Sequence, residues 1–300
     1  MKVRASARAE VNGWIVLDKP AGMTSTHAVS RLKRHFNAKK AGHAGTLDPL
    51  ATGVLPVAFG EATKTVPFVQ DGEKAYRFTV RWGIETDTDD SDGSVVAQSD
   101  TRPAANGILA LLPRFTGTIE QTPPAYSAVK INGERAYDLA RGGEAPVLSP
   151  RPVTIYALDL IGAGLDEAVF EARCGKGTYV RAIARDLGRD LGCYGHVCAL
   201  RRTRVGPFYE TDAVTLPALE DPASCAEALR RVEAGLMELP CVVVNSGAAA
   251  RLRRGQPLLL RGNDAPLNGS AYALCGGVAI AVGAVENGEL IPHRVFNLPL

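Results

Sequence analysis

Residues 75–82, AYRFTVRW, alternate strictly along the chain. This alternation predicts a β-strand with Tyr76, Phe78, Val80 and Trp82 on one face and with arginine and threonine on the other. A strand of this kind buries one face and leaves the other in contact with solvent. On this pattern alone, Tyr76 is expected to be an aromatic residue of the core.

The chain has 300 residues, of which 46% are hydrophobic and 22% charged, which is enough apolar material for a sizeable core. One large domain and one small domain are expected for this length. The sequence contains no run of about 18 apolar residues, and the segment MKVRASARAEVNG has no hydrophobic region typical of a signal peptide. We therefore expect a cytoplasmic protein that does not enter a membrane.

The six cysteines lie mostly in apolar surroundings and show no paired CxxC spacing. This distribution favours reduced thiols over a disulfide framework. One cluster could be considered as a zinc site, namely Cys193, His196 and Cys198. Its spacing is poor for zinc, and no second pair of ligands accompanies it. We expect no metal site.

Positive charge is concentrated in two parts of the chain. Residues 1–64 hold ten Lys and Arg against four Asp and Glu, and residues 170–210 hold eight against four. Residues 65–130 hold six against nine. This asymmetry favours a polyanionic partner such as nucleic acid, although solvated surface lysines would give the same counts.

In the N-terminal part, the segment GWIVLDKP predicts a strand that ends at Pro20, followed by a helix from about Thr26 with its basic residues exposed. Residues 42–64, GHAGTLDPLATGVLPVAFGEATK, are interpreted as a glycine-rich loop with neither a long helix nor a clean strand. Asp48 lies in this loop before a proline. A lone Asp-Pro is ordinarily a turn in which the carboxylate caps a nearby amide.

Further along, TDTDDSDG is interpreted as an acidic turn, because its spacing does not fit a calcium loop. Residues 153–161 and 168–174 predict strands, and Thr178 is expected to cap a helix that carries arginines on one stripe. GKGT lacks the order of a nucleotide P-loop. The arginine-dense segment HVCALRRTRVGPF predicts a strand, for which an exposed edge protected by charge is one interpretation.

The pattern changes near Pro240. The last 60 residues contain one cationic helix, AAARLRRGQ, which is expected to end at Gly255, and then short apolar strands separated by glycine. These features predict a compact β-barrel at the C-terminal end.

The motif GHAGTLDPLATGVLP resembles the catalytic motif of the TruB family of tRNA pseudouridine-55 synthases. The resemblance extends in the family's order through VLDKPAGMTS, GEATK, KAYRFTVRWG, TDTDDSDG, QTPPAYSAVKINGERAYDLAR, GTYVRAIARDLG and LRRTRVGPF, and covers most of residues 13–210. The C-terminal segment is more weakly similar to a PUA-like domain.

The resemblance implies an α+β protein. Residues 1–239 would form the catalytic domain, with a mixed, mostly antiparallel central sheet, flanking helices and an RNA-binding cleft. Residues 240–300 would form a small PUA-like β-barrel that extends the RNA contact surface.

Motif positions in the resemblance also imply roles for individual residues. Asp48 would be the nucleophile, Tyr76 would stack beneath the target uracil, and Arg181 would be the ion-pair partner of Asp48.

Five further residues would contact the substrate. His43 would help to take the uridine out of its loop, and Tyr179 and the backbone of Leu200 would complete the pocket. Lys64 and Lys19 are candidates for additional direct contacts.

The reaction that the resemblance implies needs little besides these groups. Conversion of uridine to pseudouridine breaks the bond between C1′ and N1, rotates the base and joins C5 to C1′. Since all product atoms come from the substrate, we expect no cofactor and no metal. Attack by Asp48 at C6, its attack at C1′ and its removal of the 2′ proton towards a glycal are all compatible with one carboxylate.

The function implied is isomerisation of the uridine at position 55 in the T-loop of tRNA. The partner would be the T-stem-loop of tRNA, bound by a monomer without a guide RNA or an obligate protein partner. An alternative is a tRNA-binding folding chaperone whose modification activity is secondary. The substitution Asp48→Asn separates the two, because it should abolish isomerisation and leave a chaperone intact.

The basic segments predict salt-sensitive RNA binding. If phosphates meet the expected contacts, each contributes roughly 0.7 to 0.9 to the slope of log K against log salt concentration. The residues expected to make these contacts are Arg31, Lys33, Arg34, Arg201, Arg202 and Arg204. Filter-binding titrations at several salt concentrations would measure the slope, and a flat response would contradict the assignment.

Overall fold

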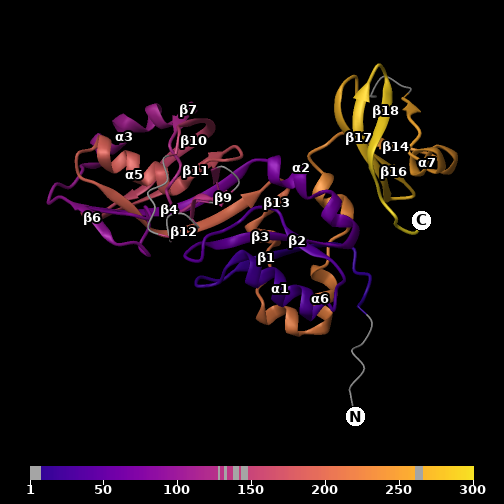
Figure 1. Ribbon diagram of the computed structural model, residues 1–300, viewed down its shortest axis with the longest axis horizontal. Coiled ribbons are helices and arrows are strands. Elements are labelled where there is room, and N and C mark those ends of the chain that lie inside the picture. The colour runs from indigo at the N-terminus through magenta and orange to yellow at the C-terminus, as the bar shows by residue number, and fades with distance from the viewer. Residues whose placement is uncertain (1–7, 128, 132–133, 138–141, 143–147, 261–265) are drawn as a thin grey trace, which may run out of the picture.

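The computed structural model describes residues 8–127, 129–131, 134–137, 142, 148–260 and 266–300. Part of the motif QTPPAYSAVKINGERAYDLAR lies outside these ranges. Two separate sheets dominate the described residues, a larger one in the N-terminal two thirds and a smaller one near the C-terminus (Figure 1). No helix formed by the described residues has both the length and the apolar character needed to cross a membrane.

The larger sheet has nine strands in the order β1-β3-β12-β4-β11-β10-β7, with β2 beside β3 and β13 beside β12. Its strands are β1 (Gly13–Lys19), β2 (Ala41–His43), β3 (Thr52–Phe59), β4 (Lys74–Trp82), β7 (Gly117–Gln121), β10 (Arg151–Ala163), β11 (Glu167–Cys174), β12 (Gly195–Val205) and β13 (Phe208–Tyr209). All pairings are antiparallel except that of β12 with β3. The α+β class with a mixed, mostly antiparallel central sheet is therefore confirmed.

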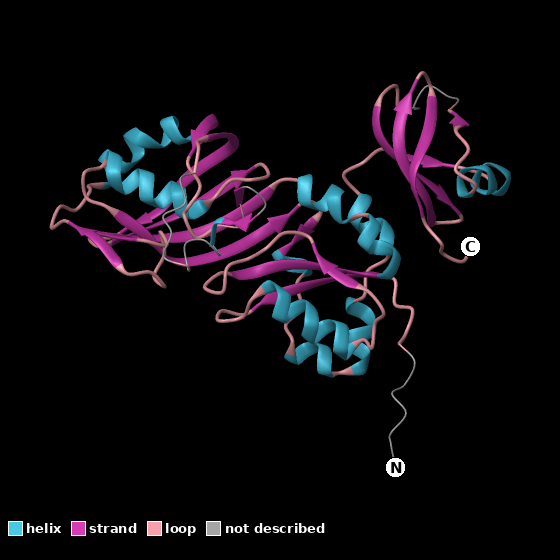
Figure 2. Ribbon diagram, viewed as in Figure 1, coloured by secondary structure: helices cyan, strands magenta, loops and turns pink. Residues whose placement is uncertain are grey.

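Helices cover this sheet unevenly. Among the described residues that precede the smaller sheet, the α-helices are α1 (Ser25–His35), α2 (Val66–Asp71), α3 (Ala105–Leu111), α5 (Val180–Asp190) and α6 (Pro222–Ala228). Figure 2 shows α3 and α5 beside the β4-β11-β10 part and α1 and α6 beside the β1-β3 part. Ala28 and Leu32 of α1 belong to the same buried cluster as Ile183 of α5. Two short hairpins, β5 (Ile84–Thr86) with β6 (Val95–Gln98) and β8 (Lys130–Ile131) with β9 (Glu134–Arg135), complete this region.

The one-sided cover explains why β4 could be predicted. Phe78, Val80 and Trp82 are buried against the helix-covered side, while Arg77 and Arg81 are exposed and pair with glutamates of β11.

The prediction that residues 42–64 contain no clean strand is wrong, because Thr52–Phe59 forms β3. This strand is buried on both faces. Leu55 and Val57 belong to the main hydrophobic core, whereas Val54 and Ala58 belong to a second core on the other side of the sheet. A strand covered on both faces has no polar alternation, and the glycine and proline within it suggested a loop.

Two local predictions also need correction. The strand β12 is not an exposed edge, since it lies between β3 and β4. Thr178 does not cap α5: its hydroxyl donates to the carbonyl of Gly175 at 3.2 Å, and Tyr179 occupies the N-cap position without a side-chain cap.

The smaller sheet has five strands in the order β14-β16-β17-β18-β15. Its strands are β14 (Cys241–Val243), β15 (Leu258–Leu259), β16 (Gly269–Cys275), β17 (Val278–Glu286) and β18 (Glu289–Val295), and α7 (Ser246–Arg253) packs against them. The sheet is curled, in agreement with the expected PUA-like domain (Figure 1).

This small sheet shares a core with the rest of the protein. Tyr272, Val282 and Phe296 belong to the same buried cluster as Trp14 and Leu236. The backbone of the C-terminal segment is held as well, because Lys64 donates to the carbonyl of Val295 at 2.8 Å and Asn297 donates its N–H to Glu61 at 2.6 Å. The two sheets are therefore joined by apolar packing and by hydrogen bonds.

Phe296 is fully buried in this shared core, so Phe296→Ala should lower the free energy of unfolding by about 3–5 kcal/mol. Urea denaturation followed by circular dichroism would measure the loss. Leu267→Ala is the matched control, since Leu267 is 86% exposed and its truncation should change stability by no more than about 0.5 kcal/mol. Equal effects of the two substitutions would contradict a shared core.

Candidate active site

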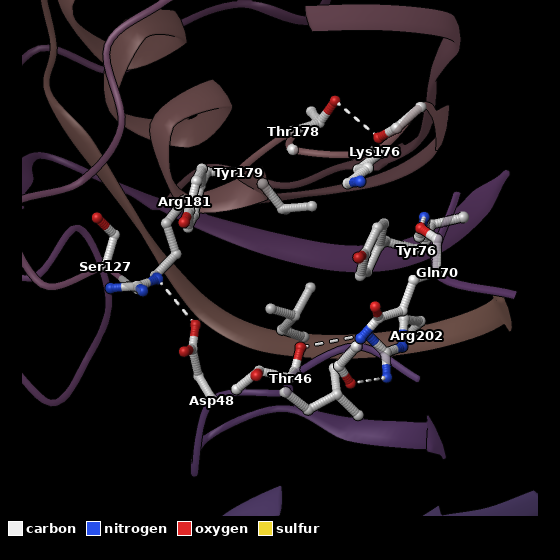
Figure 3. Close-up of a pocket in the computed structure, with 17 residues that line it drawn as sticks. Thr46, Asp48, Gln70, Tyr76, Ser127, Lys176, Thr178, Tyr179, Arg181 and Arg202 are labelled. Carbon is white, nitrogen blue, oxygen red and sulfur yellow. Dashed lines mark hydrogen bonds and ion pairs between the residues drawn. The ribbon is translucent and has the colours of Figure 1, made fainter. Parts of the chain in front are cut away.

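A cavity of about 560 Å³ opens where the loop before β3 meets β4, β12 and the start of α5 (Figure 3). Five of the residues singled out by the sequence line it: Asp48, Tyr76, Tyr179, Arg181 and Leu200. They come from four separate segments of the chain. Their spacing along the chain carries no information on proximity, whereas the family resemblance implied one pocket, and the structure brings all five together.

Asp48 and Arg181 form an ion pair with 3.0 Å between Oδ2 and Nε. The Arg181 side chain is only 5% exposed, whereas that of Asp48 is 39% exposed. Arg181 also donates to the carbonyls of Thr88 at 2.7 Å and Tyr126 at 2.9 Å, and it lies 3.3 Å from a carboxylate oxygen of Asp90. A fixed, buried cation therefore holds one carboxylate at the cavity surface (Figure 3).

Tyr76 projects from β4 into the same cavity, and its ring faces the space above β12 (Figure 3). The residue is half-buried, so it is not the closed core aromatic that alternation alone predicted. Burial raises the pKa of the Tyr76 phenol to about 12, with the nearby Arg202 guanidinium acting in the opposite direction. The phenol is consequently neutral at physiological pH.

The loop that carries Asp48 is held by Arg202, which is only 2% exposed. Its guanidinium donates to the carbonyls of Gly45 at 3.0 Å, Thr46 at 3.2 Å and Val54 at 2.8 Å. A charged donor that serves three carbonyls fixes the path of the chain around Asp48.

Two side chains of the N-terminal segment hold the other side of this loop. The Ser25 hydroxyl donates to the carbonyl of Leu47 at 3.0 Å and accepts from its N–H at 2.8 Å. Lys19 is fully buried and donates to the carbonyls of Met23 at 2.7 Å and Pro49 at 3.3 Å. Burial lowers the pKa of Lys19 to about 8. Lys19 thus supports the loop from behind and does not line the cavity.

Gln121 positions the backbone of Tyr179. Its amide nitrogen donates to the Tyr179 carbonyl at 3.1 Å, and its amide oxygen accepts from the Tyr179 N–H at 2.8 Å. Gln121 is buried at the end of β7, far from Tyr179 in sequence. Its only sequence signal was its place in a motif, so sequence reasoning missed it.

Besides Lys19, two sequence-predicted site residues are not among those that line the cavity. His43 ends β2, and burial together with the Arg202 charge lowers the pKa of its imidazole. The Lys64 ammonium group forms an ion pair with Glu61 at 2.7 Å and donates a hydrogen bond to the carbonyl of Val295.

The acidic turn of the motif TDTDDSDG contributes to the site by pairing with arginines of α5. Asp89 and Asp90 are both buried, and they pair with Arg185 and Arg181 of α5. Sequence reasoning recorded the acidic residues and the arginine stripe separately, because nothing in their spacing shows that they meet. Among the described residues, no group of three or more His, Cys, Asp and Glu side chains is placed to hold a metal ion.

Only some of the six basic residues expected to contact RNA phosphates have side chains that are free of internal partners among the described residues. Arg202 is buried, Arg201 pairs with Asp18 and Glu210, and Arg204 pairs with Glu73 and Glu238. These pairs measure between 2.9 and 3.0 Å.

The other three residues lie on α1, and their side chains form no hydrogen bond or ion pair within the described part of the chain: Arg31, Lys33 and Arg34. The salt slope expected from this group is therefore reduced to about 2 to 3.

Comparison with known families and proteins gives concordant results. The model of the TruB family pseudouridylate synthase N-terminal domain matches residues 33–180, and that of the tRNA pseudouridylate synthase B C-terminal domain matches residues 181–239. Proteins named tRNA pseudouridine synthase B from Rhodopseudomonas palustris and Bradyrhizobium diazoefficiens are each 62% identical over 301 residues. These matches cover 97% of this chain and 82% and 87% of the relatives.

Solved structures share the fold. A chain from a Cbf5-Nop10-Gar1 complex is 25% identical, with a TM-score of 0.72 over 94% of this chain and 83% of that one. A chain from an H/ACA RNP bound to a substrate RNA containing 2′-deoxyuridine has a TM-score of 0.74 at 21% identity, over 99% and 92% of the two chains. The latter likeness concerns the fold alone.

The role of Arg202 in the site leads to a stability prediction. Arg202→Met should destabilise the protein by roughly 3 kcal/mol, because three carbonyls, with that of Val54 in the interior, would lose a charged donor. Arg77→Met on the neighbouring strand is the matched control, since Arg77 is 51% exposed and its pair with Glu171 should contribute only about 0–1 kcal/mol. Urea denaturation compares the two, and similar losses would contradict the buried role of Arg202.

Proposed function

This chain belongs to the TruB family of pseudouridylate synthases, and from that membership we propose that it isomerises uridine to pseudouridine at position 55 in the T-loop of tRNA. The observation that carries the proposal is the 3.0 Å pair of Asp48 with the buried Arg181 at the wall of a cavity. The cavity volume of about 560 Å³ lies within the range of small-ligand sites. A nucleotide taken out of its loop would enter this cavity.

In the proposed reaction Asp48 is the nucleophile. The bond between C1′ and N1 breaks, the detached uracil rotates within the cavity, and C5 bonds to C1′. The proton leaves C5 and a proton is gained at N1, so the product is an isomer of the substrate. The pair with Arg181 supports this role, because the buried guanidinium fixes the direction of the carboxylate.

Tyr76 is proposed to stack on the target uracil. Extrusion of a base from its stack costs on the order of a few kcal/mol, and aromatic stacking returns about 1–3 kcal/mol per base. The raised pKa of the Tyr76 phenol favours this stacking role over proton removal from C5 by the hydroxyl alone.

The remaining residues are proposed to shape and approach the pocket. Tyr179 and Leu200 line it, and the neutral ring of His43 would meet the RNA beside it as the uridine leaves its loop. Lys19 and Lys64 are proposed to act mainly by support, because their ammonium groups are bonded to carbonyls of the protein.

We also propose a division of labour along the chain. Residues 1–239 would carry the chemistry, and residues 240–300 would extend the RNA contact beyond the T-stem-loop. The protein would act in the cytoplasm as a monomer without a guide RNA or an obligate protein partner. High identity across 97% of the chain to proteins named as tRNA pseudouridine synthases supports this proposal.

The test is tritium release from C5-labelled uridine in an unmodified tRNA transcript, followed by mapping of the modified position. The wild type should release tritium from the T-loop uridine. Asp48→Asn should reduce the rate by at least about a thousandfold, since it removes the nucleophile, while tRNA affinity stays nearly unchanged.

Asp166→Asn is the control, because Asp166 is a surface residue that does not line the cavity. Absence of release from the wild type despite tight tRNA binding would overturn the enzymatic proposal and leave a chaperone role standing.

A further inference from the structure

The helix α5 carries three arginines at successive turns on one face, and each pairs with an acidic residue between Glu85 and Asp90. The outermost pair, Arg189 with Glu85, is separated by 2.6 Å, and its arginine is 52% exposed. The two inner arginines are buried. The first of them, Arg181, holds Asp48, but the second, Arg185, does not line the cavity and has no part in the proposed chemistry.

Arg185 repeats the binding pattern of Arg181 one turn further along the helix. It lies 3.0 Å from the Asp89 carboxylate and donates to the carbonyl of Thr122 at 2.8 Å. Arg181 likewise binds the acidic turn and the carbonyl of Tyr126. The two arginines therefore fasten the same two segments to α5.

Asp186 is a second partner of Arg185, at 2.8 Å, and this carboxylate is more exposed than Asp89. Arg185 thus has one partner at the surface and one in the interior. Only the interior partner belongs to the turn that touches Arg181.

Asp89 combines an uncommon backbone conformation with burial. Its φ of +60° lies in the left-handed region, which Asp and Asn adopt more readily than other residues besides glycine. Burial raises the pKa of its carboxyl to about 6, with Arg185 and Arg181 acting in the opposite direction. Backbone bonds hold it there, from the Asp89 N–H to Thr86 and from the Val197 N–H to the Asp89 carbonyl. A buried charge costs stability, and groups with perturbed pKa values cluster at functional sites.

The neighbours of Asp89 on both sides contact Arg181 directly. The carbonyl of Thr88 accepts from Arg181 at 2.7 Å, and Asp90 lies 3.3 Å from the same guanidinium nitrogen. A change in the path of the turn at Asp89 would therefore move both contacts of Arg181 together.

We propose that Arg185 and Asp89 are positioning residues for the isomerisation, whose buried pair fixes the 88–90 turn so that Thr88 and Asp90 hold Arg181 against Asp48. This inference rests on the proposed function. A shift of the guanidinium would misplace the carboxylate relative to the bound uridine, and misplacements of about 1 Å can cost on the order of a hundredfold in rate.

The test uses Asp89→Asn and Arg185→Gln in the full-length protein, with single-turnover rate constants and tRNA dissociation constants measured separately. Asparagine tolerates the left-handed backbone, so the first substitution removes the charge and keeps the shape. Each variant should lower the rate constant by about 10- to 100-fold with a nearly unchanged dissociation constant. Arg189→Gln is the matched control on the same stripe and should retain the wild-type rate.

A second measurement distinguishes positioning from general support. In an Arg181→Lys background, Asp89→Asn should cause little further loss, because its effect passes through Arg181. The same fold-loss in both backgrounds, or rates equal to wild type in the single variants, would overturn the inference. If Arg185→Gln fails to fold, Arg185→Lys keeps the charge and tests the same coupling. An inactive wild type would instead refute the proposed function, which separates the two failures.

Discussion

The buried guanidinium of Arg202 is the interaction on which the site depends. It lies on a central strand and serves the carbonyls of Gly45, Thr46 and Val54, so that the loop carrying Asp48 is tied to the middle of the sheet. An arginine without carboxylate partners is expensive to bury, and here carbonyl oxygens compensate its charge. Because the same strand pairs with β4, the anchor of the Asp48 loop and the backbone beneath Tyr76 form one rigid unit. The geometry of the cavity follows from this arrangement.

A second electrostatic layer lies on the opposite wall. There, α5 presents Arg181 and Arg185 to the acidic turn, and both arginines also bind carbonyls of residues 122–126. The proposed nucleophile is thus placed by two independent systems, Arg202 behind its loop and Arg181 in front of its carboxylate. Both use buried arginines, whose fixed planar donors hold several acceptors in set directions. Burial of the Asp89 carboxyl costs stability, and its pair with Arg185 is proposed to define the position of Arg181.

The hydrophobic framework explains both the successes and the failures of prediction. The strand β4 was evident from alternation because one of its faces is covered by α5 and the other meets solvent. By contrast, β3 was missed because cores lie on both of its faces, as Leu55 and Val54 show. The basic strand β12 was open to interpretation as a protected edge, since arginine content does not distinguish an edge from a central strand with a buried guanidinium. Shared packing of Phe296 and Trp14 joins the small sheet to the large one.

The sequence by itself determined the elements with strong local signals and, through its ordered motifs, the family. The same motifs predicted Asp48, Tyr76 and Arg181 as site residues, and all three line one cavity. These follow from local information, namely side-chain periodicity and the identity of short motifs. Only the tertiary structure decided which charges meet. It assigned Arg201 and Arg204 to internal pairs, Arg202 to the loop carbonyls and Asp89 to Arg185. The physical reason is that an ion pair depends on the distance between two groups in space, and groups about a hundred residues apart, such as Asp89 and Arg185, carry no trace of that distance in their spacing.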